Sequence, residues 1–187
     1  SDLNFDISNM SSGFVPSSEY YDGFYGKGRW KFSNIYSLSI GQGELLVTPI
    51  QMANFASIIA NRGYYYNPNI VTHINGKKTS NSQRKYLDID KTHFDYVVDA
   101  MENVVMNGSA RRAYMRELTL CGKTSTVQNP HGYDHSGFIG FAPKNNPKIA
   151  IAAYIENAGW GGRSAASISS LASEYYIYGK TKRNWLE

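Results

Sequence analysis

The sequence has little of what would place it quickly in a class. Its 187 residues include a single cysteine, Cys121, so no disulfide can form within the chain, and the count leaves the cellular compartment open. No apolar run approaches the ~20 residues that a membrane-spanning helix needs, and no signal peptide is recognisable. We therefore expect any anchor or export signal of the natural protein to lie outside this stretch.

Charge of one sign is also scarce. The net charge is +4, charged residues make up 18% and hydrophobic residues 42%, which is ordinary for a folded globular protein. The densest basic run is the tail from Lys180 to Arg183, and it is too short to indicate a nucleic-acid partner. We expect this tail to be a solvated surface.

Tyrosine, in contrast, is abundant, with 15 residues. Several are adjacent in the chain, as in Tyr20-Tyr21, Tyr64-Tyr65-Tyr66 and Tyr175-Tyr176. Such clusters can line a groove for a sugar or a peptide. Tyrosines more often pack half-buried with the hydroxyl in water, and we expect that arrangement here.

Helix caps and hydrophobic periodicity predict most of the secondary structure. A helix from Ile50 to Asn61 begins with Thr48 as N-cap and Pro49 at the first helical position, and Gly63 stops it. A second helix, 90–107, carries one apolar stripe. The remaining predicted elements are a short strand over 69–74, three strands over 118–127, 136–142 and 149–156, and a closing helix over 163–178.

The order of these elements predicts an α+β fold, an antiparallel β-sheet flanked by helices, within residues 48–187. Residues 1–47 show no sustained period and are expected to form an irregular loop region. Such a long irregular opening is unusual for a self-contained domain, so we expect the chain to be a portion of a larger one.

The stretch Gly122-Lys123-Thr124 resembles the end of a nucleotide-binding P-loop, but its surroundings exclude that function. A P-loop needs a glycine five residues before Gly122, where this sequence has Glu117. Its lysine should also open a helix, whereas here a β-branched stretch runs into the turn signal at Pro130.

A strand that carries Lys123, Thr124, Ser125 and Thr126 presents an ammonium group and hydroxyls along one sheet edge. These groups suit a carboxylate ligand, and an exposed strand edge can pair with an extended peptide. Strand propensity alone would also explain the threonines, and an edge lysine can serve only to discourage aggregation.

The sequence also raises the hypothesis of a metal site. Cys121, His131, Asp134 and His135 could be drawn as ligands, but they lack the spacing of a structural zinc site. Asp134, His135 and Ser136 do not form a catalytic triad, because neighbours in an extended segment point to opposite sides.

Three longer stretches carry a family resemblance. They are SIGQGELLVTPIQMA with the residues around it, DKTHFDYVVDAMENVV, and CGKTSTVQNPHGYDHSGFIGFAPKNNPKIAIAAYIENAGWGG. In this order they resemble the C-terminal half of the transpeptidase domain of penicillin-binding protein 2, the class B, cell-elongation family. The resemblance implies a partial penicillin-binding transpeptidase domain, similar to the serine β-lactamases, over residues 1–187.

The family's site uses three motifs, of which the chain carries one. The only S-x-x-K match is Ser82 to Lys85, in a polar loop, and we interpret it as a coincidence. The motif S-x-N does not occur, and Tyr65-Tyr66-Asn67, which imitates a variant of it, follows the end of a helix. The nucleophilic serine and its lysine are therefore expected to lie outside this chain, which should be inactive alone.

The third motif is present, with one change. By resemblance, Lys123 helps to hold the substrate carboxylate and tunes the proton network of the missing serine. Thr124 and Thr126 bind the carboxylate through their hydroxyls, and the backbone N–H of Thr126 contributes to the oxyanion hole. Ser125 stands where the family has glycine, and Gly137 where it usually has a bulky aromatic residue, which puts the affinity for β-lactams in doubt.

The implied function is that of a peptidoglycan D,D-transpeptidase, which cross-links stem peptides through an acyl-enzyme and is acylated by penicillins. No cofactor is implied. The implied partners are stem peptides, β-lactam antibiotics and membrane proteins of cell elongation. The intact enzyme would be anchored at the periplasmic face of the cytoplasmic membrane, and this piece would be soluble. The alternatives are a penicillin-sensing protein or hydrolase of the same fold and a non-catalytic peptide-binding module.

Overall fold

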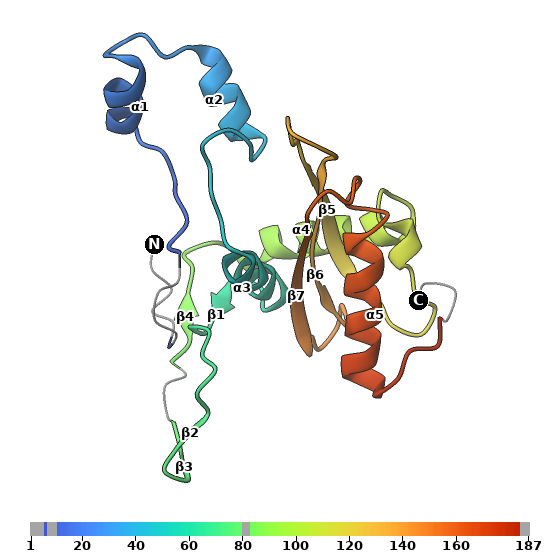
Figure 1. The fold of residues 1–187 in the computed structure, drawn as a ribbon. Helices are drawn as coiled ribbons and strands as arrows, with labels where there is room; N and C mark the ends of the chain where they lie inside the picture. Colours follow the sequence, from blue (N-terminus) through green and yellow to red (C-terminus); the bar gives the residue numbers. More distant parts are fainter. Residues whose placement is uncertain (1–5, 7–10, 80–82, 184–187) are drawn as a thin grey trace.

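The structure is a computed structural model that describes residue 6, residues 11–79 and residues 83–183. At its centre lies a three-stranded antiparallel sheet in the order β5-β6-β7 (Figure 1). The strands are β5 Cys121–Val127, β6 His135–Ala142 and β7 Ile149–Ile155. All three predicted strands are present. The first begins at Cys121 instead of residue 118, and its pairing with β6 begins at Cys121 and Phe141.

Helices cover both faces of this sheet, which confirms the α+β prediction. They are α3 Pro49–Ala60, α4 Lys91–Met106 and α5 Ala165–Tyr178. The core has two parts, one on each face of the sheet, because successive side chains of β6 point to opposite faces. Phe138 packs with Ala165 and Ala166 of α5, and Phe141 packs with Ile59 of α3 and with residues of α4.

The helix α3 begins at its predicted cap, Thr48. The Thr48 hydroxyl accepts a hydrogen bond from the Gln51 N–H at 3.3 Å, and the Gln51 side chain accepts one from the Thr48 N–H at 2.8 Å. This capping box satisfies two backbone donors that a helix end leaves unpaired. At the second helix, Asp90 accepts from the Thr92 N–H at 2.8 Å.

The prediction of an irregular region over 1–47 is wrong for two segments. These are the helices α1 Ser18–Tyr25 and α2 Phe32–Ser39. Each has eight residues, about two turns, so neither can show a sustained hydrophobic period. Side-chain contacts stabilise α1 instead. The Glu44 carboxylate accepts hydrogen bonds from the Tyr21 hydroxyl at 2.8 Å and from the Tyr25 hydroxyl at 2.9 Å.

These two bonds shift the pKa of each partner. Burial, followed by the hydrogen bond to Glu44, raises the pKa of Tyr21 to about 12. The two hydroxyl donors lower the pKa of Glu44 below its ordinary value, because they stabilise the charged carboxylate. Glu44 therefore ties α1 to the segment that leads into α3.

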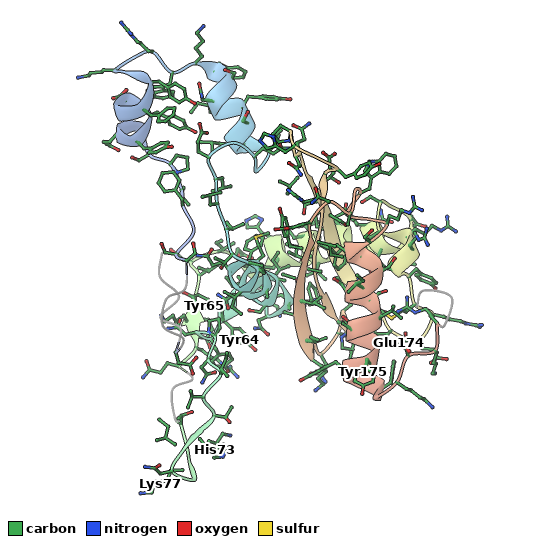
Figure 2. All side chains as sticks on the ribbon, in the orientation of Figure 1. Tyr64, Tyr65, His73, Lys77, Glu174 and Tyr175 are labelled. Carbon is green, nitrogen blue, oxygen red and sulfur yellow. The ribbon has the colours of Figure 1, made fainter. Side chains whose placement is uncertain are left out.

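The segment between α3 and α4 projects away from the sheet (Figure 1). Its strands are β1 Tyr64–Tyr65, β2 His73–Ile74, β3 Lys77–Lys78 and β4 Lys85–Tyr86, paired as β1-β4 and β2-β3. The strand predicted over 69–74 is thus reduced to its last two residues. The predicted polar loop contains a hairpin instead, because Asn75 and Gly76 both have positive φ, 50° and 75°, as a two-residue type I′ turn requires. His73 and Lys77 lie at its tip (Figure 2).

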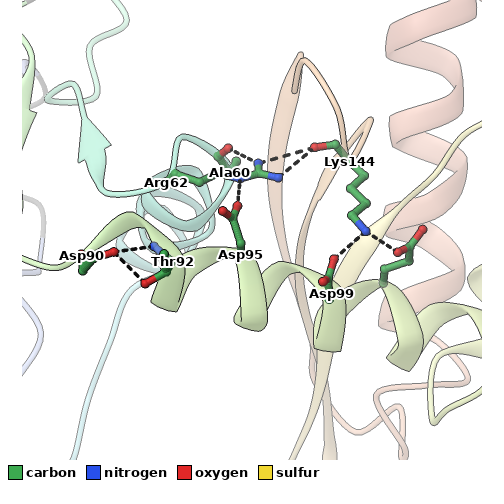
Figure 3. A network of polar contacts seen from close by, with 8 residues as sticks. Ala60, Arg62, Asp90, Thr92, Asp95, Asp99 and Lys144 are labelled. Atoms are coloured by element: carbon green, nitrogen blue, oxygen red, sulfur yellow. Dashed lines mark hydrogen bonds and ion pairs between the residues drawn. The ribbon is translucent and has the colours of Figure 1, made fainter.

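A polar network joins α3, α4 and the β6–β7 turn (Figure 3). Lys144 Nζ lies 2.6 Å from both Asp99 Oδ1 and Glu102 Oε2. Arg62 follows α3, and its guanidinium lies 3.4 Å from Asp95 and donates to the Lys144 carbonyl. The network fixes the end of the sheet that is opposite to the β5–β6 loop.

The sequence predicted that the basic tail is a solvated surface. This prediction is wrong for Arg183. Arg183 Nε lies 3.1 Å from Glu174 Oε2 on α5, and both side chains are about nine-tenths buried. Lys182 forms an ion pair with Glu117. Because these partners lie 9 and 65 residues away in the sequence, the composition of the tail gave no indication of them.

The tyrosine clusters differ from one another. Tyr64 and Tyr65 are half-buried, as expected, whereas Tyr175 and Tyr176 are 62% and 65% exposed. Figure 2 shows Tyr175 beside Glu174 on α5, and Tyr64 and Tyr65 on the other side of the sheet.

Candidate active site on strand β5

The four residues singled out in the sequence, Lys123 to Thr126, all lie in β5. Within the described part of the chain, β5 pairs with β6 alone, so its second edge is open. Lys123 therefore lies in a strand, whereas the lysine of a P-loop would open a helix. An open strand edge offers a row of backbone donors and acceptors to an extended ligand.

The strand divides its side chains between two faces. Lys123 and Ser125 share the face of Cys121, which packs with α3 and α4. Thr124 and Thr126 lie on the opposite face, beside the connection from β7 to α5. A ligand along the open edge would thus meet the ammonium group from one side and the hydroxyls from the other.

Lys123 is exposed, and its Nζ donates a hydrogen bond to the Thr124 carbonyl at 2.8 Å. This bond keeps the ammonium group close to the strand that carries it. An exposed lysine has several rotatable bonds and can exchange such a contact for a ligand carboxylate. The position suits electrostatic capture of an anion.

The threonine hydroxyls have protein partners that the sequence did not reveal. Thr124 Oγ1 lies 2.8 Å from Ser109 Oγ, and Thr126 Oγ1 accepts a hydrogen bond from the Gly161 N–H at 3.4 Å. Ser109 follows α4, and nothing in its local sequence indicates the contact. For the Gly161 contact the sequence does contain an indication, since the paired glycines Gly161 and Gly162 in a loop are typical of a close approach between backbones.

Gly161 makes such an approach to the site. A Cβ added at Gly161 would overlap with the carbonyl oxygens of Ser125 and Gly137 and lie 3.0 Å from the Ser125 nitrogen. Its backbone therefore lies directly against β5 and β6 on the α5 face. The β7–α5 connection thus packs against β5 on the α5 face of the sheet.

Further bonds hold the loop that follows β5. Asn129 Nδ2 donates to Asn157 Oδ1 at 2.8 Å, and the Asn157 N–H donates to His135 Nδ1 at 3.0 Å. The Gly159 N–H donates to the Asp134 carbonyl at 2.8 Å. The β5–β6 loop and the β7–α5 connection are thus tied together at the end of β5 nearest Thr126.

The other residues considered from the sequence do not join this site. Ser82 lies outside the described residues, and Lys85 lies in β4, in a separate two-stranded sheet. Cys121 is fully buried, and burial raises the pKa of its thiol to about 12. In residues 6, 11–79 and 83–183, no three His, Cys, Asp or Glu side chains cluster so that they could hold a metal ion. In the same residues, no helix is both long and apolar enough to cross a membrane.

Comparisons with known proteins point to one family. The penicillin binding protein transpeptidase domain matches residues 3–174. A curated relative, the peptidoglycan D,D-transpeptidase MrdA of Acinetobacter baumannii, is 30% identical over 197 residues, which cover 95% of this chain and 29% of the relative. The peptidoglycan D,D-transpeptidase MrdA of Haemophilus influenzae is 28% identical and covers 92% of this chain.

Solved structures agree with this assignment. Pseudomonas aeruginosa PBP2, in complex with WCK 5153, superimposes with a TM-score of 0.81 at 31% identity, covering 97% of this chain and 41% of that chain. PBP2 of Helicobacter pylori, at 22% identity and a TM-score of 0.80, shares the fold. The chain thus spans less than a third of the length of the curated relatives named above, which it matches over 29% and 30% of their lengths. It belongs to the penicillin-binding protein transpeptidase family and is part of a transpeptidase domain of the penicillin-binding protein 2 type.

Proposed function

We propose that the chain is the C-terminal portion of one transpeptidase domain, and that the whole protein is a serine-type peptidoglycan D,D-transpeptidase. The observation that carries the proposal is the open edge of β5, with Lys123 exposed beside it, in a chain of this family. The whole enzyme would cross-link stem peptides through an acyl-enzyme, and penicillins would acylate it in the same way.

In this proposal β5 forms one wall of the site. A stem peptide pairs with the open edge as an added strand, and Lys123 attracts its carboxylate. The Thr124 and Thr126 hydroxyls bind the same carboxylate, while their contacts with Ser109 and Gly161 keep them in place. The Thr126 N–H stabilises the oxyanion that forms when the serine attacks.

The serine and its lysine are supplied by another part of the protein. The serine oxygen bonds to the carbonyl carbon of a stem peptide or β-lactam, and the amine on that carbon leaves with the proton. With a stem peptide, the amine of a second peptide then displaces the serine. No cofactor takes part in these steps. The enzyme would act at the periplasmic face of the cytoplasmic membrane, together with membrane proteins of cell elongation.

The test uses the full-length protein and a fluorescent penicillin. We expect the full-length protein to be labelled covalently and the 187-residue chain alone to remain unlabelled. In the full-length protein, Lys123→Ala should slow acylation at least about tenfold, which corresponds to about 1.4 kcal/mol of transition-state stabilisation. Lys148→Ala, at an exposed lysine beside the β6–β7 turn, is the matched control and should leave the rate unchanged. If the chain alone is labelled, or if Lys123→Ala acylates at the normal rate, the proposal fails.

The same experiment separates the alternatives. A penicillin-sensing domain would be labelled but would not cross-link stem peptides in vitro. A non-catalytic peptide-binding module would bind stem peptides without any covalent label, even at full length.

A further inference from the structure

The two departures from the family pattern, Ser125 and Gly137, face each other across the sheet. They are direct partners in the antiparallel register of β5 and β6. A Cβ added at Gly137 would overlap with Ser125 Oγ and lie 3.3 Å from Ser125 Cβ. The Ser125 hydroxyl therefore occupies the space above Gly137. It leans over β6 and away from the open edge of β5.

This placement depends on the missing side chain at position 137. Gly137 does not have a positive φ, so its backbone would accept another residue. Any Cβ there would displace the Ser125 hydroxyl to another staggered rotamer. The other rotamers turn the hydroxyl off β6, on the same face as Lys123 and closer to the open edge.

The backbone at this pair has little room to move away from such a clash, because β5 and β6 are paired along seven residues. On the opposite face, the backbone of Gly161 lies directly against the carbonyl oxygens of both Ser125 and Gly137. The loop that carries Gly161 is held in turn, because the Ser136 hydroxyl donates to the Trp160 carbonyl at 3.1 Å and accepts from the Ala165 N–H at 3.0 Å. Because these contacts restrict movement of the backbone at Ser125 and Gly137, we expect the Ser125 side chain to respond by rotation.

We propose that Gly137 is a positioning residue that acts through Ser125. By leaving room over β6, it keeps the Ser125 hydroxyl out of the path of a ligand that lies along β5. The pair thereby sets how bulky an acylating ligand the open edge accepts. This inference rests on the proposed function, and it places a specificity determinant on β6, a strand that carries none of the recognised motif.

The experiment is a double-mutant cycle in the full-length protein. Second-order acylation rates are measured with benzylpenicillin and with a cephalosporin that has a bulky oxyimino side chain. The variants are Gly137→Ala, Ser125→Gly and the two combined. Gly23→Ala is the matched control, since a Cβ added there meets no atom within 4 Å.

In the wild-type background, Gly137→Ala should slow acylation by the bulky cephalosporin about tenfold or more, and by benzylpenicillin less. In the Ser125→Gly background, the same change should alter either rate by no more than about twofold, because no hydroxyl remains to be displaced. Gly23→Ala should behave as wild type. A merely structural role for Gly137 would slow both drugs alike, and Ser125→Gly would not reverse the effect.

Equal losses in both backgrounds, or no loss in the wild-type background, overturn the inference. If Gly137→Ala fails to fold, folding of the double variant supports the steric pair, and its failure to fold contradicts it. An unlabelled wild-type protein contradicts the proposed function itself, so the two failures are distinguishable.

Discussion

Single residues in this chain have roles that depend on the face of the strand they occupy. Lys123 and Ser125 share one face of β5, while Thr124 and Thr126 are held from the other by Ser109 and Gly161. Glu44 shows a similar dependence on position. It lies within the family stretch SIGQGELLVTPIQMA, but its carboxylate is occupied by two tyrosine hydroxyls of α1. Its observed contacts are therefore structural.

Glu44 should make the stability of the chain depend on pH. Its pKa is lowered in the folded state from an ordinary value of 4.5, so its stabilising contribution is present above that value and is lost as pH falls through the folded pKa. We expect thermal unfolding midpoints of wild type and Glu44→Gln to differ at pH 7 and to converge as pH falls below about 4.5. The exposed Glu156→Gln is the control. A difference that stays constant from pH 7 to pH 3.5 would show that the carboxylate charge does not matter.

At the scale of elements, the C-terminal tail is bound to α5 by a buried ion pair. Besides Glu174, Arg183 contacts Ser170 Oγ through Nη1 at 3.1 Å. Lys182, its neighbour in the tail, pairs with Glu117, where both side chains are about half exposed. Two adjacent basic residues thus differ sharply in burial.

Replacing Arg183 should therefore cost far more stability than replacing Lys182. Arg183→Ala leaves the Glu174 carboxylate buried without its cation, and such losses cost about 3–5 kcal/mol of unfolding free energy. Lys182→Ala, the matched control, should change it little, since exposed pairs are screened by solvent. Chemical denaturation of both variants measures the difference. If both variants lose the same unfolding free energy, the tail contributes through packing and not through the buried ion pair. The double variant Glu174→Leu/Arg183→Leu should recover most of the loss.

The elements also show what the sequence could predict. The helices α3 and α4 and the strands β5 to β7 were predicted, because caps and periodicity are local signals. The identity of Ser125 and Gly137 was noted, but their pairing was not, because the register depends on how the β5–β6 loop folds. The helices α1 and α2 were missed because eight residues carry no sustained period. The contacts of Ser109, Glu44 and Arg183 are tertiary, and no local pattern encodes them.

On the scale of the whole molecule, the chain divides into a packed body, the projecting segment of β1 to β4, and an arm (Figure 1). The body is the sheet with α3, α4 and α5, and its two cores meet across β6 through Phe138 and Phe141. The arm contains α1 and α2, which lie away from the sheet (Figure 1). Tyr21 is the only buried residue of α1, and α2 has none. The backbone bridge between Phe14 and Leu46 joins the two ends of this arm.

This division predicts unequal local stability. Opening a segment costs the free energy of the apolar contacts and protected hydrogen bonds that it loses. The arm has few buried apolar contacts. In the 187-residue chain, amide hydrogens of residues 18–39 should exchange about 100-fold faster than those of α4 and β6, after correction for intrinsic rates. Hydrogen-exchange mass spectrometry resolves these segments. Because Glu44 holds α1 through two hydroxyls, Glu44→Gln should accelerate exchange further in α1 and leave α4 unchanged. Protection of α1 and α2 equal to that of β6 would show that the arm unfolds only together with the body.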